Sequence, residues 1–255
     1  MGFKDHFSGH AQIYAAARPD YPPALFDFLA GLCRRRQLAW DSGTGSGQAA
    51  LGLVRHFTRV IATDASQAQL DAATPHERIS YRCQAAEQLL AEAGQVDLVT
   101  IAQALHWLDT GQVYEQVDKA LAPQGVLAVW CYGVAEISPA IDAVIQDLYQ
   151  RLLGEFWPPE RVHVENGYRD LAFPYPKIAV PAFYLEQHWT LEQQVAYLYS
   201  WSATQRYIKA HGRDPVMLVT DQLRDVWHQA SASAESPSRQ VRWPMTLLAG
   251  RKPDP

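Results

Sequence analysis

Short apolar runs alternate with amphipathic stretches along the first half of the chain. Four runs have the composition of buried strands, at residues 37–43, 59–64, 96–103 and 125–133, and a shorter one lies at 79–85. The stretches between them, at 49–57, 65–73, 85–93 and 111–122, consist of good helix formers. Continuous apolar strands that alternate with helices predict a parallel sheet covered by helices on both faces.

The segment before the first strand predicts an extended arm followed by a helix. Residues 1–22 are polar and aromatic and end in prolines, which favours an extended backbone. Residues 23–36 carry apolar side chains at helical spacing, with proline at the start and Arg34, Arg35 and Arg36 at the end. Basic side chains in that place favour a helix C-terminus more than a polyanion site.

The pattern changes after residue 133. A helix is expected within residues 139–156, and the aromatic and proline-rich stretch that follows predicts a cap-like insertion over 134–180. Strands at 182–190 and 238–252 enclose helices at 191–212 and 215–231, and they can complete the sheet with an antiparallel edge strand. We therefore expect one α/β domain over 1–255, with a doubly wound, seven-stranded, mostly parallel sheet, an arm at 1–22, a core at 23–133 and C-terminal elements at 181–255.

Composition narrows the classes of function. The 255 residues include 48% hydrophobic and 19% charged side chains, which is ordinary for a globular protein. A formal net charge of −5 gives no global attraction to nucleic acid or to an anionic membrane. The three scattered cysteines fit a reduced cytoplasm, and no signal peptide or membrane-length apolar run is expected. No histidine pair has metal-site spacing, so no metal is expected.

The most informative motif follows the first predicted strand, where Gly43, Gly45 and Gly47 precede a helix. Glycine tolerates positive φ and lets the backbone approach a ligand, and the helix N-terminus offers free N–H groups. Together these features predict a nucleotide-binding turn. A P-loop is excluded because no Gly-Lys-Ser/Thr sequence follows the glycines.

The acids near this turn indicate the kind of nucleotide. The dinucleotide pattern G-x-G-x-x-G/A is matched only from Gly45, with Ala50 in its third position. Asp41 would repel a pyrophosphate but suits a ligand with a cationic amino group or a sulfonium. Asp64 ends the second predicted strand 21 residues after Gly43, where a carboxylate can accept hydrogen bonds from ribose hydroxyls.

Several segments resemble one family in order and spacing over residues 37–133. They are WDSGTGSG, VIATDAS, CQAAEQL, VDLVTIAQALHWLD and KALAPQGVLAVWCYG. They resemble motifs of the class I S-adenosylmethionine-dependent methyltransferases. YAAARPDYP and YSWSATQRYIKAHGRDP further resemble the type 11, trans-aconitate methyltransferase-like branch. The resemblance implies a Rossmann-like fold and S-adenosylmethionine as methyl donor.

The resemblance also implies roles for cofactor-site residues. Asp41 and the backbone of the three glycines would face the methionine end, and Asp64 would bind the ribose. The remaining expected cofactor contacts are Ala65, Ala86 and Glu87 along the adenine and Gln103 on the substrate side. Ala85 departs from the acid that many relatives carry there, so an adenine contact is absent or comes from Gln84.

The acceptor side is less defined by the sequence. His106 is a candidate general base or orienting group, against a purely structural role in its loop. Tyr14, Arg18 and Arg206 are candidate substrate contacts, while Trp201 is expected in the core. Other residues of the insertion that could reach the mouth of the pocket are His163, Tyr168 and Arg169.

No convincing acid–base pair accompanies these candidates, which favours an acceptor that needs no base, such as a carboxylate. We therefore expect O-methylation of a small molecule, with no nucleic-acid or membrane partner. Two other classes stay open. One is an NAD(P)-dependent oxidoreductase, and the other is a cofactor-binding protein without methyltransferase activity.

Overall fold

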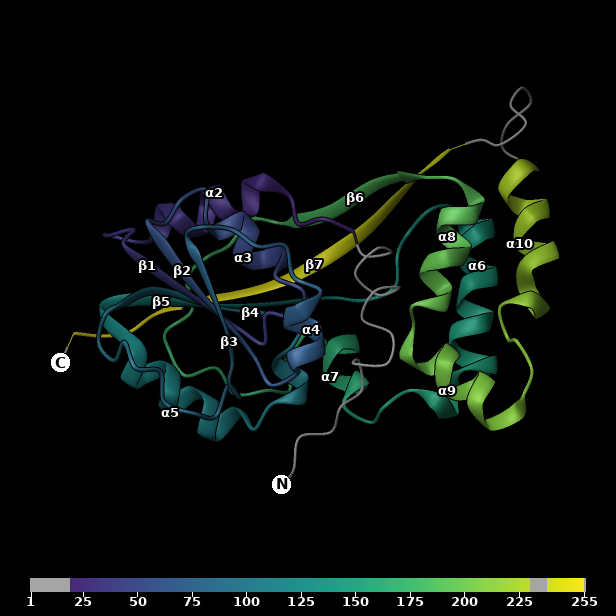
Figure 1. The fold of residues 1–255 in the computed structure, drawn as a ribbon. Helices are drawn as coiled ribbons and strands as arrows, with labels where there is room; N and C mark the ends of the chain where they lie inside the picture. The colour runs from purple at the N-terminus through teal and green to yellow at the C-terminus, as the bar shows by residue number, and fades with distance from the viewer. Residues whose placement is uncertain (1–18, 230–237, 255) are drawn as a thin grey trace.

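The computed structural model describes residues 19–229 and 238–254, and these contain a seven-stranded sheet (Figure 1). The strand order is β3-β2-β1-β4-β5-β7-β6. Strands β1 to β5 are parallel, and β7 runs antiparallel to both β5 and β6. Their bounds are β1 Leu38–Ser42, β2 Arg59–Asp64, β3 Ile79–Cys83, β4 Val96–Ala102, β5 Leu121–Tyr132, β6 Phe183–Trp189 and β7 Arg239–Arg251. The predicted doubly wound, mostly parallel sheet is confirmed.

Helices cover both faces of the parallel strands, as alternating side chains require. On β5, Val126, Ala128 and Trp130 join the cluster that includes α2 and α3, whereas Leu127 and Val129 join the cluster that includes α5. The elements around the parallel strands are α2 Pro23–Leu32, α3 Gln48–Leu53, α4 Gln67–Asp71, the 3-10 turn η2 Leu105–Trp107 and α5 Thr110–Ala120.

A group of helices lies at one end of the sheet (Figure 1). These are α6 Pro139–Asp147, α8 Leu191–Tyr199, α9 Ser202–His211 and α10 Met217–Gln229, and we call them the helical cap. Between α6 and β6 the chain also forms η3 Leu148–Leu152, η4 Gly154–Phe156 and α7 Arg161–Glu165. The cap therefore combines the predicted insertion with helices that follow β6.

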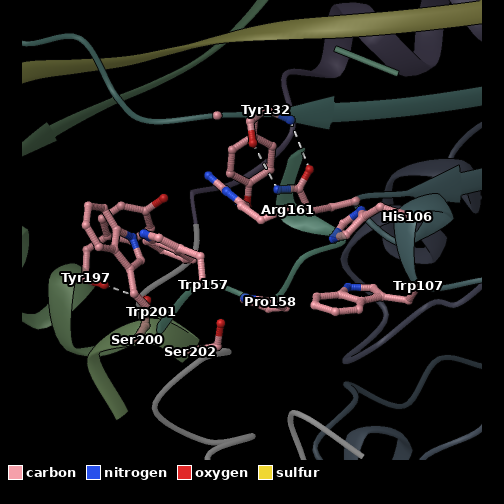
Figure 2. Close-up of a pocket in the computed structure, with 12 residues that line it drawn as sticks. His106, Trp107, Tyr132, Trp157, Pro158, Arg161, Tyr197, Ser200, Trp201 and Ser202 are labelled. Carbon is pink, nitrogen blue, oxygen red and sulfur yellow. Dashed lines mark hydrogen bonds between the residues drawn. The ribbon is translucent and has the colours of Figure 1, made fainter. Parts of the chain in front are cut away.

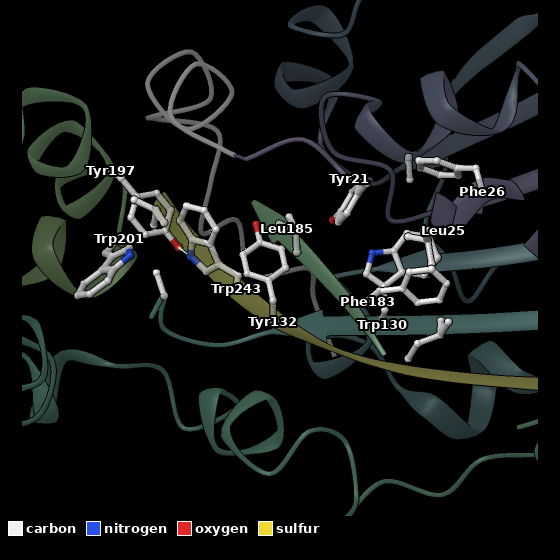
Figure 3. Packing of buried hydrophobic residues seen from close by; sticks show 14 of the residues in the cluster. Tyr21, Leu25, Phe26, Trp130, Tyr132, Phe183, Leu185, Tyr197, Trp201 and Trp243 are labelled. Atoms are coloured by element: carbon white, nitrogen blue, oxygen red, sulfur yellow. Dashed lines mark hydrogen bonds between the residues drawn. The ribbon is translucent and has the colours of Figure 1, made fainter. Parts of the chain in front are cut away.

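The core of the cap is continuous with one face of the sheet (Figure 3). Trp243 of β7 packs edge-on against Tyr197 of α8, with ring centroids 5.5 Å apart, and its Nε1 donates to the Tyr197 hydroxyl. Tyr197 in turn meets the edge of Trp201 at 5.9 Å. Burial of these large rings fixes the cap relative to the carboxyl ends of the parallel strands.

Three local expectations were wrong. Residues 85–93 form turns rather than a helix, and the Gln84 side chain donates to the backbone oxygens of Gln88 and Leu89. The helix that begins at Pro23 ends at Leu32, so the arginines lie beyond its last turn, although Arg36 Nε still donates to the Ala30 oxygen. Strand β5 begins at Leu121, four residues earlier than expected, because its start pairs with Val96 of β4.

Candidate functional site

The turn after β1 has the geometry that its glycines predict. Gly43, Gly45 and Gly47 have φ values of 67°, 56° and 84°, a region that side chains disfavour. A Cβ at Gly43 would stand 2.8 Å from Cβ of Ala104, and one at Gly47 would stand 2.4 Å from the hydroxyl of Tyr81. The glycines therefore let this turn pack tightly between the loop after β4 and a side chain of β3.

Asp41 lies beneath the turn and is fully buried. Its two carboxylate oxygens accept hydrogen bonds from the hydroxyls of Thr44, at 2.5 Å, and Thr100, at 2.7 Å. Burial raises the pKa of Asp41 to about 6, although both hydroxyls oppose that shift by stabilising the charged form. The acid thus joins the turn to β4 and places negative charge directly behind the turn.

Asp64 at the end of β2 contacts the same turn from the other side. Its Oδ2 accepts from the backbone N–H of Gly45 and its Oδ1 from that of Ser66, each at 2.8 Å. Each oxygen has further lone-pair capacity. The side chain is only partly buried, so the carboxylate is both fixed in position and accessible.

Gln69 of α4 is a site residue that sequence reasoning missed. The side chain is 4% exposed. Its Oε1 would lie 3.7 Å from a Cβ added to Gly45. Among the described residues this oxygen has no hydrogen-bond partner. A buried acceptor without a partner, beside a closely packed glycine turn, fits a ligand that brings its own hydrogen-bond donors.

The residues expected along the adenine lie on the segments that follow β2 and β3. Ala65 and Ser66 follow Asp64 directly, and Ala86 is buried in the cluster that includes α5. Glu87 accepts from the backbone N–H of Asp109 at 3.3 Å, so it links the 84–90 segment to the start of α5. Gln84 Nε2 donates to the backbone oxygens of Gln88 and Leu89, so its amide group is held within its own loop.

Gln103 marks the boundary between the turn and a neighbouring pocket. It has φ of 53° and bonds the Tyr132 backbone twice, with its amide donating to the carbonyl at 3.0 Å and its carbonyl accepting from the N–H at 2.9 Å. This bridge ties the end of β4 to the end of β5. Gln103 lines the pocket that opens on the cap side.

The pocket lies between the carboxyl ends of β4 and β5 and the helical cap (Figure 2). The sheet side contributes Gln103, His106, Trp107, Tyr132 and Gly133. The cap side contributes residues of three segments, namely Trp157, Pro158, Arg161, Tyr197, Ser200, Trp201 and Ser202. Trp201, expected in the core, is buried and also lines this pocket.

His106, the sequence candidate for a general base, lines the pocket. Its ring is buried, tilted against Trp107 at 4.6 Å between centroids, and held at Nδ1 by the hydroxyl of Tyr168 at 2.9 Å. Tyr168 is 1% exposed, and burial raises its pKa well above the usual range, so the phenol stays protonated. The pair joins the loop after β4 to the segment after α7.

The only arginine that lines this pocket among the described residues is Arg161, which the sequence did not single out. Arg206 of α9, the expected carboxylate contact, is not among the lining residues, and its Nη1 is 3.5 Å from the Phe156 oxygen. His163 pairs with Asp170 at 2.7 Å, and neither it nor Arg169 lines the pocket. Tyr14 and Arg18 lie outside the described residues.

Within residues 19–229 and 238–254, no three histidine, cysteine or acidic side chains are grouped as metal ligands. In those ranges no helix has both the length and the apolar character to cross a bilayer.

Known proteins match both the sequence and the fold. A family model described as a methyltransferase domain matches residues 40–129. A type II methyltransferase structure from Anaeromyxobacter dehalogenans is 38% identical, with a TM-score of 0.84, covering 92% of this chain and 97% of its own. A methyltransferase-like protein of Dictyostelium discoideum is 29% identical over 98% of this chain and 96% of its own length.

A more distant structure shares the fold alone. The phosphoethanolamine N-methyltransferase 2 of Haemonchus contortus, solved with S-adenosylhomocysteine, has a TM-score of 0.50 at 16% identity, covering all of this chain and 61% of its own.

A Rossmann-like sheet with a glycine turn and an acid at the end of β2 defines a nucleoside-binding enzyme. The chain belongs to the class I S-adenosylmethionine-dependent methyltransferases, and its cofactor is S-adenosylmethionine. This membership favours a methyl donor over the nicotinamide dinucleotide, and an enzyme over a binding protein without activity.

Proposed function

We propose that this enzyme methylates a small-molecule acceptor in the pocket between the sheet and the helical cap. One observation supports this location above others. The segment after β4 contacts the glycine turn through Ala104 and lines the pocket through its neighbours Gln103 and His106. A cofactor on the turn and an acceptor in the pocket would therefore meet across a single short segment.

The cofactor-site residues have separable roles in this proposal. Asp64 binds the ribose hydroxyls with an orientation fixed by two backbone N–H groups. Gln69 supplies an acceptor for a donor on the ligand, and Asp41 acts from behind the turn as a positioning residue through Thr44. Ala65, Ala86 and Glu87 line the adenine side. When bound, S-adenosylmethionine supplies the electrophilic methyl group.

We further propose that the atom methylated is a carboxylate oxygen. A carboxylate is ionised at neutral pH, so the enzyme needs to align it rather than deprotonate it, and alignment alone can lower a barrier by about 7–11 kcal/mol. The described lining of the pocket contains no aspartate or glutamate that could act as a base. A hydroxyl acceptor is the second candidate, favoured by the position of His106 in the lining.

The test is incubation with methyl-labelled donor and a pool of small organic acids, alcohols, phenols and amines. Labelled product that releases methanol in mild alkali would be a methyl ester and would support carboxylate methylation. An alkali-stable product would contradict the carboxylate and leave methyl transfer intact, whereas no S-adenosylhomocysteine from any pool would contradict the function.

Matched variants link that turnover to the site. Asp64→Ala should weaken S-adenosylhomocysteine binding by tenfold or more, because it removes a charged acceptor worth about 1.5–3 kcal/mol. Asp71→Ala is the control, since that exposed side chain of α4 accepts from Gln67 and from no other described residue. Equal affinities in the two variants would contradict the role of Asp64.

A further inference from the structure

Arg161 lines the pocket, and part of its guanidinium group makes no hydrogen bond to a described residue. Its Nε donates to the hydroxyl of Tyr149 at 2.8 Å. Its two terminal nitrogens make no hydrogen bond or ion pair with any described residue, and no carboxylate there lies within ion-pair distance. Among the described residues, no carboxylate therefore pairs directly with this guanidinium group.

The orientation of Arg161 is nevertheless fixed. Tyr149 accepts from Arg161 and donates to Oε1 of Glu165 at 2.5 Å, and burial raises the pKa of Tyr149 to about 12, so the phenol keeps its proton. The guanidinium carbon lies 5.0 Å from the ring centroid of Trp157, whose Nε1 donates to the Tyr149 carbonyl oxygen. An arginine held by one nitrogen and one aromatic face keeps its remaining fork available for a planar anion.

The rest of the pocket complements a flat anion. No acidic side chain is among its described lining residues, and Ser202 lines it with a hydroxyl that makes no hydrogen bond to another described residue. Its walls are largely aromatic, with Trp107 and Tyr132 on the sheet side facing Trp157 and Trp201 on the cap side (Figure 2). Aromatic walls favour a flat, unsaturated body, and the single cation favours an anionic end.

We propose that Arg161 recognises the carboxylate of the acceptor, and that the acceptor is a small planar acid with an aromatic or conjugated body. This inference rests on the proposed function only in placing the acceptor in this pocket, and it holds whichever acceptor atom takes the methyl group. Arg161 is thus a specificity-determining residue at the start of α7, in the segment between α6 and β6.

The experiment compares cinnamate with its neutral amide, cinnamamide, by calorimetric titration of the full chain loaded with S-adenosylhomocysteine. The two probes share the flat body and differ in charge. Wild-type protein should bind cinnamate at least about tenfold more tightly than cinnamamide. Arg161→Gln should abolish that preference by weakening cinnamate alone, and Arg161→Lys should keep part of it, because lysine retains charge without the fork.

Arg151→Gln is the matched control, since Arg151 is exposed and pairs with Asp147 on the same helical segment. It should leave both affinities unchanged. Equal binding of the two probes, binding of neither, or an Arg161→Gln variant that keeps the preference would each overturn the inference. So would an equal loss of both probes in Arg161→Gln, which would show a packing role.

Failure of the proposed function is distinguishable from failure of this inference. Titration with S-adenosylhomocysteine precedes the probes, and the turnover screen is run separately. A chain that binds the acid selectively but never consumes the methyl donor would contradict the function alone. A chain that methylates an acceptor without any preference for anions would contradict the assignment of Arg161 alone.

Discussion

The hydroxyl of Tyr168 lies 2.9 Å from Nδ1 of His106, which joins the cap insertion to the loop after β4. Tyr168 has φ of 57° and is 1% exposed, so the surrounding structure holds it in a backbone region that side chains disfavour. The contact orients the imidazole in the pocket lining.

His106→Gln should retain turnover within about tenfold if a carboxylate is the nucleophile, because no proton has to be removed. General-base catalysis contributes about 10²–10⁴-fold, so a loss of that size at unchanged cofactor affinity would contradict carboxylate methylation. Tyr168→Phe serves as the comparison, since it removes the hydrogen bond to Nδ1 and keeps the ring in place. It should reduce the free energy of unfolding by about 1 kcal/mol.

Gly43→Ala should destabilise the protein and weaken cofactor binding together. The new Cβ would collide with Ala104 at 2.8 Å and impose a positive φ on alanine, for a loss of about 2 kcal/mol or more in the free energy of unfolding. Gly31→Ala is the control, because Gly31 lies on exposed α2 surface with nothing within 4 Å of its Cβ. Urea unfolding should show a gain of up to about 1 kcal/mol there. If Gly43→Ala and Gly31→Ala changed the free energy of unfolding equally, the close packing at Gly43 would be contradicted.

Gln69→Leu should leave the cofactor-free protein as stable as the wild type or more stable, because it removes a buried oxygen without a partner. The same change should weaken S-adenosylhomocysteine binding by roughly tenfold, as measured by calorimetry. Gln67→Leu, on the exposed side of α4, should not alter that affinity. A Gln69→Leu variant with lower stability and normal affinity would assign the side chain to the fold instead of the ligand.

Asp41 should make the cofactor-free protein less stable as pH rises through its titration. Its pKa in the folded state is about 6, above the ordinary value of 3.8, so between these values the native state binds more protons than the unfolded chain. The free energy of unfolding therefore falls as pH rises from about 4 to about 6, by about 3 kcal/mol in all. Above pH 6 this contribution is constant.

Asp41→Asn isolates that contribution. Between pH 4 and pH 7 the Asp41→Asn variant should gain stability relative to the wild type, because only the wild type loses the contribution of Asp41. The other acids titrate in both proteins and cancel in the difference. Urea unfolding at the two pH values measures this double difference. A difference that does not change with pH would show that Asp41 has an ordinary pKa in the folded state.

The sequence predicted local features where the signal is local. The apolar runs placed β2 at 59–64 without error, and the spacing of Gly43, Gly45 and Gly47 predicted a turn with positive φ. The stretch 85–93 misled the prediction because its residues are good helix formers. In the folded chain, the Gln84 side chain and a bond from Asp109 to Glu87 stabilise turns there instead.

Asp41, the three glycines and Asp64 lie on short segments in chain order, so the sequence by itself indicated them together with the strand pattern, whereas Gln69 was found only in the tertiary structure. The acceptor half depends on which distant side chains the cap brings to the carboxyl ends of β4 and β5. The sequence indicated Arg206 as a carboxylate contact and did not single out Arg161. Only the packing of η3, α7 and α8 placed Arg161 in the pocket lining and left Arg206 outside it, because burial of Tyr149, Trp157 and Trp201 sets the orientation of the cap.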